Sequence, residues 1–280
     1  MLISTPELVV VQTYPAHFYQ TLACLRNIRT LNPKCEIWLF ADNFSNFSWD
    51  NYISYCHEVY RDLVNKIVPF SDIHVLYRLR NWPWLRQQTN KLLLDKVIDR
   101  THWFFTDGDV QLRKWPAVDR VPGIILGAYQ GVPLSERDPR PGEVSSQILF
   151  YIRHMLGGEF GGFWTKDDKP ITASNPPVKI MQAEIIRGLR NLIESRFSKS
   201  LVDVHFDLRR DTRMAASEWD LIEAYRQTVL GQAPVWELDD NWYETTWSAD
   251  RELGKDWFQS RGITINAEIW QLLPETKNYL

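Results

Sequence analysis

The sequence predicts an α/β fold, and two observations support this prediction. Strand-like and helix-like segments alternate along the first third of the chain. The strand-like segments are mostly continuous apolar runs, which is typical of parallel strands covered on both faces. Of the 280 residues, 44% are hydrophobic and 24% are charged, which is the composition of a globular protein with a substantial core. We therefore expect a sheet flanked by helices.

The first repeat of this pattern is a strand, a helix and a second strand. Residues 8–12 (LVVVQ) form a β-branched run that stops at Thr13-Tyr14-Pro15. Residues 17–31 carry apolar side chains close to helical spacing, and the helix is broken at Asn32-Pro33. The second strand is expected at residues 35–40 (CEIWLF). Together these segments predict a βαβ unit with a right-handed crossover.

A second helix and strand follow in the middle of the chain. Residues 90–100 (NKLLLDKVIDR) are expected to be helical, and residues 102–106 (HWFFT) form an aromatic strand that ends at Asp107-Gly108-Asp109. A further strand is expected at residues 123–129 (GIILGAY). Ligands of open α/β sheets bind at the carboxyl ends of the strands, so the acidic residues lie where a site is expected.

The second half of the chain mixes loops and helices. Residues 131–142 and 157–177 are rich in Gly and Pro and predict long loops, which in compact domains tend to be functional or mobile. Helical spacing returns at residues 178–195 and 217–229. Residues 236–280 are rich in tryptophan, and their secondary structure is left open. The 13 tryptophans of the chain could be core residues or could stack on sugars and bases.

Charge, cysteine content and hydropathy restrict the class of protein. The net charge of −3 differs from the basic excess of proteins that coat nucleic acid. The three cysteines have no CxxC spacing, which argues against a disulfide framework and a cysteine-based zinc site. No apolar run approaches the ~18 residues that a bilayer span needs, and the N-terminus has no basic segment before its short apolar run. We expect a cytoplasmic protein without a membrane span.

Asp107 and Asp109 give the strongest chemical signal in the sequence. Two carboxylates one residue apart at the end of a strand can hold Mg²⁺ or Mn²⁺ while substrate phosphates complete the coordination shell. Asp-Gly-Asp is also a common turn sequence, because both residue types favour turns. The aromatic strand directly before it favours a metal site.

These features together resemble the GT-A glycosyltransferases, and in particular a poorly characterised family with two further motifs. Residues 84–91 (WLRQQTNK) match its Trp-x-x-Gln-Gln-x-x-Lys helix, and residues 217–219 (SEW) match its Ser-Glu-aromatic motif, with Trp where Tyr is usual. The resemblance spans roughly residues 8–230. It implies a Rossmann-like mixed sheet flanked by helices, with a helical, loop-rich C-terminal part. Residues 1–115 would bind the nucleotide sugar and residues 116–280 the acceptor, within one compact unit.

The resemblance also implies an activity, which is metal-dependent transfer of a sugar from a nucleoside diphosphate sugar to a hydroxyl acceptor. The donor expected first is a UDP-sugar, the metal is Mn²⁺ or Mg²⁺, and the acceptor is a glycan or a small molecule. Asp109 would coordinate the metal, and Asp107 would contact the ribose or reach the metal through water. Thr13 and Tyr14, at the end of the first strand, would hold the nucleobase and ribose.

Two further residues would act in catalysis. Lys91 would reach the diphosphate or the donor sugar, or it could be a solvated helix lysine. Glu218 would take the proton of the attacking hydroxyl, or it could simply favour the N-terminus of a helix that Ser217 caps. Gln87 and Gln88 would bind the donor's sugar hydroxyls, or they could face solvent.

The third metal ligand departs from the pattern of this fold. Many GT-A enzymes supply it from a histidine late in the chain, and this sequence has no histidine after His205. We take His205 as the candidate. His154 is a second candidate, and Asp239 or Asp240 could substitute.

Three alternatives to this activity or its acceptor remain open at this point. Arginines interleaved with Trp82 and Trp84, and further arginines at residues 209–213, could bind nucleic acid, with a hydroxymethylated base as the acceptor. A metal-dependent phosphohydrolase or nucleotidyltransferase also uses paired carboxylates, but residues 13–17 (TYPAH) are not the Gly-rich loop that a nucleotidyltransferase would need. A non-catalytic carbohydrate-binding protein would use tryptophan platforms, but such modules are usually all-β.

Overall fold

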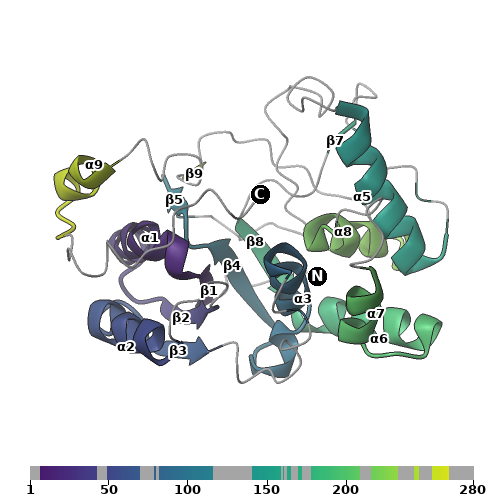
Figure 1. Cartoon of the computed structure of the whole chain (residues 1–280), viewed down its shortest axis with the longest axis horizontal. Helices are drawn as coiled ribbons and strands as arrows, with labels where there is room; N and C mark the ends of the chain where they lie inside the picture. The colour runs from purple at the N-terminus through teal and green to yellow at the C-terminus, as the bar shows by residue number, and fades with distance from the viewer. Residues whose placement is uncertain are drawn as a thin grey trace. The chain divides into compact units, whose positions relative to one another are not determined.

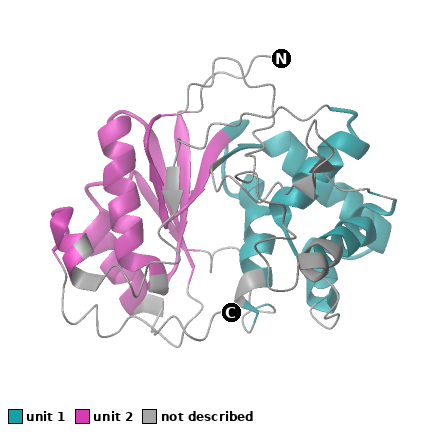
Figure 2. Ribbon diagram, turned by 90° about the horizontal axis from the view of Figure 1, so that it is seen from above, with its two compact units in different colours: residues 1–3, 75–102, 119–240 teal, residues 4–74, 103–118, 241–280 magenta. Residues whose placement is uncertain are grey.

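The computed structural model describes most of the chain, in segments. These are residues 7–42, 49–69, 79, 82–115, 141–158, 160, 163–164, 170–171, 178–208, 216–232, 243–245 and 254–264. The chain divides into two compact units, which Figure 2 colours separately. Unit 1 comprises residues 1–3, 75–102 and 119–240, and unit 2 comprises residues 4–74, 103–118 and 241–280. Neither unit is continuous in sequence. The expected functional halves, divided at residue 115, remain a prediction.

The elements of unit 2 agree with the predicted βαβ start (Figure 1). They are β1 (Leu8–Thr13), a 3₁₀ turn η1 (Pro15–His17), α1 (Phe18–Leu31), β2 (Glu36–Ala41), α2 (Trp49–Tyr60), β3 (Lys66–Pro69), β4 (His102–Asp107), β5 (Val110–Leu112), β9 (Tyr243–Thr245) and α9 (Gly254–Ser260). The strands predicted at residues 8–12, 35–40 and 102–106 and the helix predicted at residues 17–31 are confirmed. The sequence analysis did not predict α2, β3 or β5.

A five-stranded sheet has the order β3-β2-β1-β4-β8, where β8 is Val178–Gln182. β1 pairs in parallel with both β2 and β4, and β2 pairs in parallel with β3. All six residues of β1 are buried, as expected for a central parallel strand covered on both faces. Figure 2 shows the helices of unit 2 on one face of its strands. In the register of β1 and β4, Gln12 lies opposite Asp107, so the two carboxyl ends meet at one edge.

Unit 1 is mainly helical, as predicted for the C-terminal part. Besides β8, its elements are α3 (Pro83–Lys91), a 3₁₀ turn η4 (Leu94–Lys96), α5 (Pro141–Leu156), β6 (Phe163–Trp164), β7 (Pro170–Ile171), α6 (Ala183–Phe197), α7 (Leu201–Leu208) and α8 (Glu218–Thr228). The helix predicted at residues 217–229 is confirmed as α8. The sequence analysis did not predict α7 or most of α5.

The single helix predicted at residues 90–100 is wrong. α3 ends at Lys91, and the chain then turns through i→i−3 hydrogen bonds from Leu92 N to Thr89 O (3.1 Å) and from Leu93 N to Asn90 O (3.0 Å). Leu92, Leu93 and Leu94 are all at most 1% exposed. Three consecutive side chains of an α-helix point in different directions, so burial of all three favours a turn over a continued amphipathic helix.

Two further predictions need correction. The helix predicted at residues 178–195 begins only at Ala183, because residues 178–182 form β8 and its residues 179–181 are all buried, as in a strand covered on both faces. The loop predicted at residues 157–177 contains β6 and β7, which pair antiparallel. The strand predicted at residues 123–129 and most of the loop at 131–142 lie outside the described residues.

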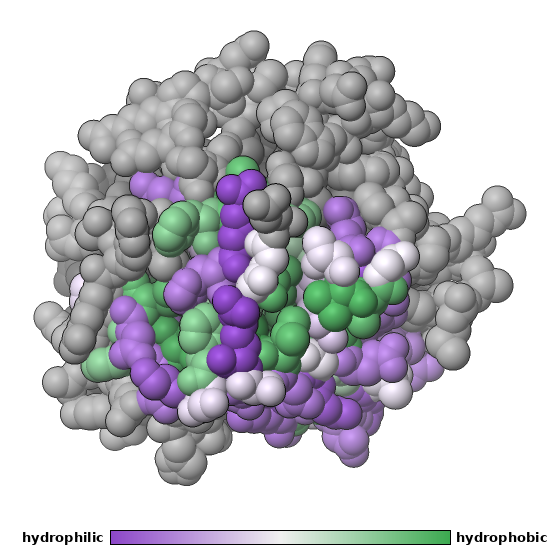
Figure 3. All heavy atoms as spheres, turned by 90° about the vertical axis from the view of Figure 1, so that its right-hand side faces the viewer, coloured by the Kyte–Doolittle hydropathy of each residue, from purple (hydrophilic) through white to green (hydrophobic). Residues whose placement is uncertain are grey.

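No described helix has the length and apolar character to cross a bilayer. Large exposed hydrophobic side chains include Trp82, Phe150, Val229 and Leu230. On the face drawn in Figure 3, hydrophobic and hydrophilic side chains are interspersed. All three cysteines are buried free thiols.

Candidate functional site

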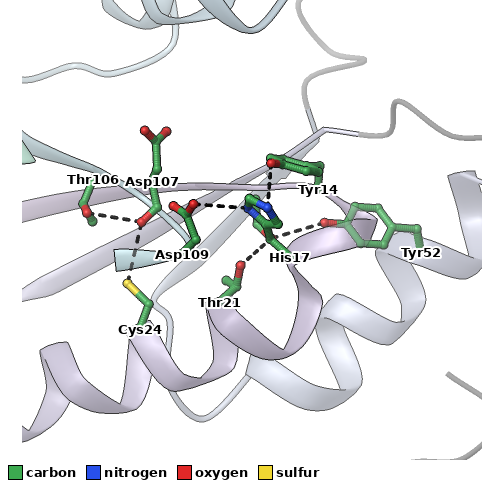
Figure 4. A network of polar contacts seen from close by, with 9 residues as sticks. Tyr14, His17, Thr21, Cys24, Tyr52, Thr106, Asp107 and Asp109 are labelled. Atoms are coloured by element: carbon green, nitrogen blue, oxygen red, sulfur yellow. Dashed lines mark hydrogen bonds and ion pairs between the residues drawn. The ribbon is translucent and has the colours of Figure 1, made fainter. Parts of the chain in front are cut away.

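The turn that carries Asp107 and Asp109 joins β4 to β5 in unit 2 (Figure 4). Gly108 N donates to Gln12 O at 2.8 Å, which fixes the turn to the end of β1. The Asn27 side chain donates to Leu112 O at 2.8 Å and accepts from Leu112 N at 2.7 Å, which ties β5 to α1. The backbone that presents the two carboxylates is therefore held on both sides.

Gly108 is required by close packing. A Cβ at this position would collide with Thr21 Oγ1 and would lie 2.9 Å from Gln12 O, which is a backbone atom. We expect Gly108→Ala to lower the free energy of unfolding by about 1–3 kcal/mol, because an overpacked position forces the backbone to move. Urea unfolding measures this. Gly158→Ala is the control, since its Cβ would meet nothing within 4 Å. Equal stability of the two variants would contradict the prediction.

Asp109 faces His17, a residue that the sequence analysis did not select. The Asp109 Oδ2 atom lies 3.8 Å from His17 Nδ1, and both residues are buried. The other ring nitrogen of His17, Nε2, lies 2.8 Å from Tyr14 Oη. Figure 4 shows the Asp109 carboxylate directed toward the His17 ring and the Asp107 side chain directed away from both. Burial lowers the pKa of His17 to about 4, against the opposing charge of Asp107, so the ring is neutral near pH 7.

Thr13 and Gln12 end β1 beside this turn. Thr13 Oγ1 lies 2.7 Å from Thr21 Oγ1 on α1 and accepts a long hydrogen bond from Tyr52 Oη on α2 (3.5 Å). Neither polar atom of the Gln12 amide has a hydrogen-bond partner among the described residues, although the side chain is only 2% exposed. Such a group is uncommon in a native interior. Gln12 was not selected from the sequence. The signal that could have found it is a polar residue at the end of the apolar run VVVQ.

In unit 1, the structure brings the two family-like motifs together. Lys91 Nζ on α3 lies 2.7 Å from Glu218 Oε1 on α8, and the side chains are only 3% and 2% exposed. The Gln88 side chain accepts a hydrogen bond from Glu218 N at 3.2 Å. Lys91 Nζ also lies 4.9 Å from the centroid of the Trp219 ring. Gln87, in contrast, is half-buried.

The helix-capping interpretation of the Ser-Glu-Trp motif is confirmed, and the catalytic role of Glu218 stays a prediction. Ser217 is the N-cap of α8 and accepts a hydrogen bond from Asp220 N, as a helix-capping residue does. Glu218 is the first residue of α8, and its carboxylate is also the partner of Lys91. Helix geometry and the ion pair therefore fix the position of this carboxylate together.

Three more buried charged residues of unit 1 were missed, and one of them, Lys179, lies near this ion pair. Lys179, Glu223 and Arg226 are 4%, 6% and 4% exposed. Burial lowers the pKa of Lys179 to about 8 and raises that of Glu223 to about 7, in each case against opposite charges nearby. In the sequence, these three residues look like ordinary charged residues on the solvent-exposed face of a helix or strand. Groups with such displaced pKa values cluster at functional sites, although structural ion-pair networks produce them too.

His205, the candidate for the third metal ligand, is held by hydrogen bonds at both ring nitrogens. Its Nδ1 lies 2.6 Å from Thr89 Oγ1 and its Nε2 lies 3.0 Å from Tyr151 Oη, so both ring nitrogens are engaged in hydrogen bonds. The residue is fully buried in unit 1. The described residues contain no group of three or more His, Cys, Asp or Glu suited to a metal ion. The His154 ring stacks against Phe197, and Asp239 and Asp240 lie outside the described residues.

Burial of His205 predicts a dependence of stability on pH. Its pKa falls from 6.5 to about 3. Between these values the unfolded chain binds a proton that the folded chain does not, so stability is full above pH 6.5 and is lost as the pH falls toward 3. We expect a loss of up to about 1.4 kcal/mol per pH unit from this group. Urea unfolding at pH 7 and pH 5 should show a smaller loss in His205→Asn than in the wild type or in the exposed-site control His57→Asn. Equal losses in all three proteins would contradict the prediction.

The comparisons with known proteins bear on the fold. No protein-family model matches the sequence, and the search of curated proteins found no significant match. Among solved structures, an active-site mutant of LgtC has a TM-score of 0.50 and 11% identity, over 95% of this chain and 100% of that one. The galactosyltransferase LgtC with donor and acceptor sugar analogs has a TM-score of 0.48 and 11% identity, over 94% and 99%. Mouse xyloside xylosyltransferase 1 has a TM-score of 0.43 and 11% identity, over 94% and 96%. The similarity to the LgtC mutant establishes the GT-A glycosyltransferase type of α/β fold.

Proposed function

We propose that the protein transfers a sugar from a nucleoside diphosphate sugar, a UDP-sugar first, to a hydroxyl acceptor with the help of a divalent ion. The observation that carries this proposal is the Asp107-Gly108-Asp109 turn. It lies at the carboxyl end of β4, beside the end of β1, in a sheet of the GT-A type. That edge of an α/β sheet is where ligands bind.

The residues of this turn fit a divalent ion. Asp107 and Asp109 offer hard carboxylate oxygens, which Mg²⁺ and Mn²⁺ prefer, and the turn is anchored by Gln12 and by Asn27 on α1. When bound, the ion would supply positive charge that neutralises the diphosphate as it departs. Asp109 would hold it directly, and Asp107 would contact the ribose or reach the ion through water.

The end of β1 would bind the nucleotide. Thr13 and Tyr14 follow the apolar part of the strand, at the edge that carries the acidic turn. The buried Gln12 amide, whose polar atoms have no partner among the described residues, supports a ligand at this position. Hydrogen bonds to a nucleobase or a ribose would satisfy such an amide.

The transfer itself needs a leaving group, and an inverting enzyme also needs a base. The bond between the anomeric carbon and the diphosphate oxygen breaks, and its electron pair leaves with the nucleoside diphosphate. The acceptor hydroxyl oxygen forms the new bond to that carbon and loses its proton, which Glu218 would take. Lys91 would stabilise negative charge on the diphosphate, and its Nζ atom also lies 2.7 Å from Glu218 Oε1. Gln87 and Gln88 would orient sugar hydroxyls.

The alternatives have less support. The α/β fold argues against a carbohydrate-binding module, because such modules are usually all-β. Of the arginines that suggested a nucleic acid acceptor, Arg86 is only 6% exposed, and residues 78, 80 and 209–213 lie outside the described residues. We therefore propose a glycan or small-molecule hydroxyl as the acceptor.

A thermal-shift panel tests the donor site. UDP, GDP, CMP, ADP and dTDP are added with and without Mn²⁺ to the wild type and to Asp109→Asn. A ligand that binds only the folded state raises its melting temperature. We expect a shift with one nucleoside diphosphate that requires Mn²⁺ and is lost in Asp109→Asn. No shift with any nucleotide would contradict the proposal.

A further inference from the structure

We infer that His17 is a ligand of the divalent ion, in the role that a histidine late in the chain has in many enzymes of this fold. The inference rests on the proposed function, because it assigns a further residue to the same metal site. His17 comes from η1, between β1 and α1, and so lies near the N-terminus. Its Nδ1 atom faces the Asp109 carboxylate, as Figure 4 shows.

The distance between the two groups suits a shared ion. Nδ1 of His17 and Oδ2 of Asp109 are 3.8 Å apart, which is too long for a hydrogen bond. Two atoms that each bind one Mg²⁺ or Mn²⁺ at about 2.1 Å can be no more than about 4.2 Å apart. An octahedral ion at this bond length holds neighbouring ligand atoms about 3.0 Å apart and opposite ones about 4.2 Å apart. The observed 3.8 Å lies between these values, so a small side-chain rotation would bring both atoms onto one ion.

Tyr14 orients the His17 ring for this role. Its hydroxyl oxygen lies 2.8 Å from Nε2, and the two ring centroids are 4.1 Å apart. With the proton on Nε2, the ring donates to Tyr14 Oη and directs the Nδ1 lone pair toward Asp109. A histidine that binds a metal usually donates its other N–H in this way, and that bond fixes the tautomer and the ring orientation.

The local backbone holds this arrangement. Pro15 occupies the first turn of η1, where its fixed φ suits a helical start, and His17 N donates to Tyr14 O at 2.9 Å. His17 is 9% exposed and Asp109 is 8% exposed, so water has little access to either side chain. An imidazole ligand suits Mn²⁺ better than Mg²⁺, because Mg²⁺ is the harder ion and prefers oxygen ligands. We therefore expect the site to favour Mn²⁺.

Pulsed electron paramagnetic resonance of bound Mn²⁺ tests this assignment directly. Wild-type protein with Mn²⁺ and UDP should show the nuclear coupling of a directly bound imidazole nitrogen. When the protein's histidines carry ¹⁵N, the ¹⁴N coupling should be replaced by a ¹⁵N coupling. The coupling should be absent in His17→Gln. It should be retained in Tyr14→Phe, because that variant keeps the His17 imidazole. We expect His17→Gln to bind Mn²⁺ about tenfold more weakly than the wild type, which is the size of effect seen when a group that supports a metal is lost. The decrease in Mg²⁺ affinity should be smaller.

The outcomes separate the two proposals. Mn²⁺ that binds and is lost in Asp109→Asn, but shows no nitrogen coupling in the wild type, would overturn the role of His17 and leave the metal site of the proposed function intact. A coupling that persists in His17→Gln would assign the nitrogen to another histidine and would also overturn it. If wild-type protein binds no Mn²⁺ with any nucleotide, both the role of His17 and the metal dependence fail.

Discussion

Asp109→Asn is expected to reduce the rate of sugar transfer by about 10²–10³-fold, the size of effect seen when one group that stabilises developing charge is removed. The amide keeps the shape of the side chain but loses the negative charge that holds a divalent ion. The measurement is the rate of nucleoside diphosphate release at saturating Mn²⁺, with the fraction of folded protein determined in parallel.

Asp62→Asn is the matched control for Asp109→Asn in the same unit, because the Asp62 side chain is 88% exposed. It removes the same charge from a solvated position, so we expect the wild-type rate. If Asp109→Asn and Asp62→Asn have equal rates, the acidic turn is not the metal site.

The second large effect concerns the buried ion pair of Lys91 and Glu218. Lys91→Met is expected to lower the free energy of unfolding by about 3–5 kcal/mol, because it leaves the Glu218 carboxylate buried without its partner. The double variant Lys91→Met/Glu218→Gln should recover part of this loss, because the remaining charge is also removed. Chemical unfolding of the two single variants and the double variant measures the coupling. Losses that simply add would contradict the prediction.

Activity separates a catalytic Glu218 from a structural one. The control is a second buried ion pair of unit 1, between Asp95 and Arg190, whose side chains are 1% and 7% exposed. Asp95→Asn should destabilise the fold but leave the kcat of the folded protein close to the wild type. We expect Glu218→Gln to lower kcat by about 10²–10⁴-fold, as for loss of a general base. Equal kcat values in Glu218→Gln and Asp95→Asn would assign Glu218 a structural role.

Local signals explain which elements the sequence predicted well. β1, β2 and β4 are continuous apolar or aromatic runs, and α8 begins at a serine cap, so each is encoded within its own residues. α2 and β3 were missed for different reasons. The α2 sequence WDNYISYCHEVY does carry a helical pattern, with the buried residues Tyr52, Cys56 and Tyr60 four positions apart, and this signal was overlooked. β3 has only four residues at the edge of the sheet, and so short a strand depends on pairing with its neighbour more than on its own pattern.

The same distinction applies to the candidate site. Asp107 and Asp109 were predicted because they are adjacent in sequence and follow a strand. The approach of His17 to Asp109 was not, because it depends on how η1 and the turn after β4 come together in the folded sheet. Lys91 and Glu218 were each selected from a motif, whereas their 2.7 Å contact and deep burial are products of tertiary packing. The buried Lys179 and Glu223 had no sequence signal that distinguishes them from solvated charges.

The central claim is that the protein consumes a nucleoside diphosphate sugar, and turnover tests it most directly. Purified protein is incubated with UDP-, GDP- and dTDP-sugars and a mixture of glycan and small-molecule acceptors, with and without Mn²⁺, and the products are identified by mass spectrometry. We expect one donor to yield its nucleoside diphosphate and a glycosylated acceptor, only with a divalent ion and not with Asp109→Asn. Release of inorganic phosphate or nucleoside monophosphate instead, or no consumption of any donor, would contradict the account.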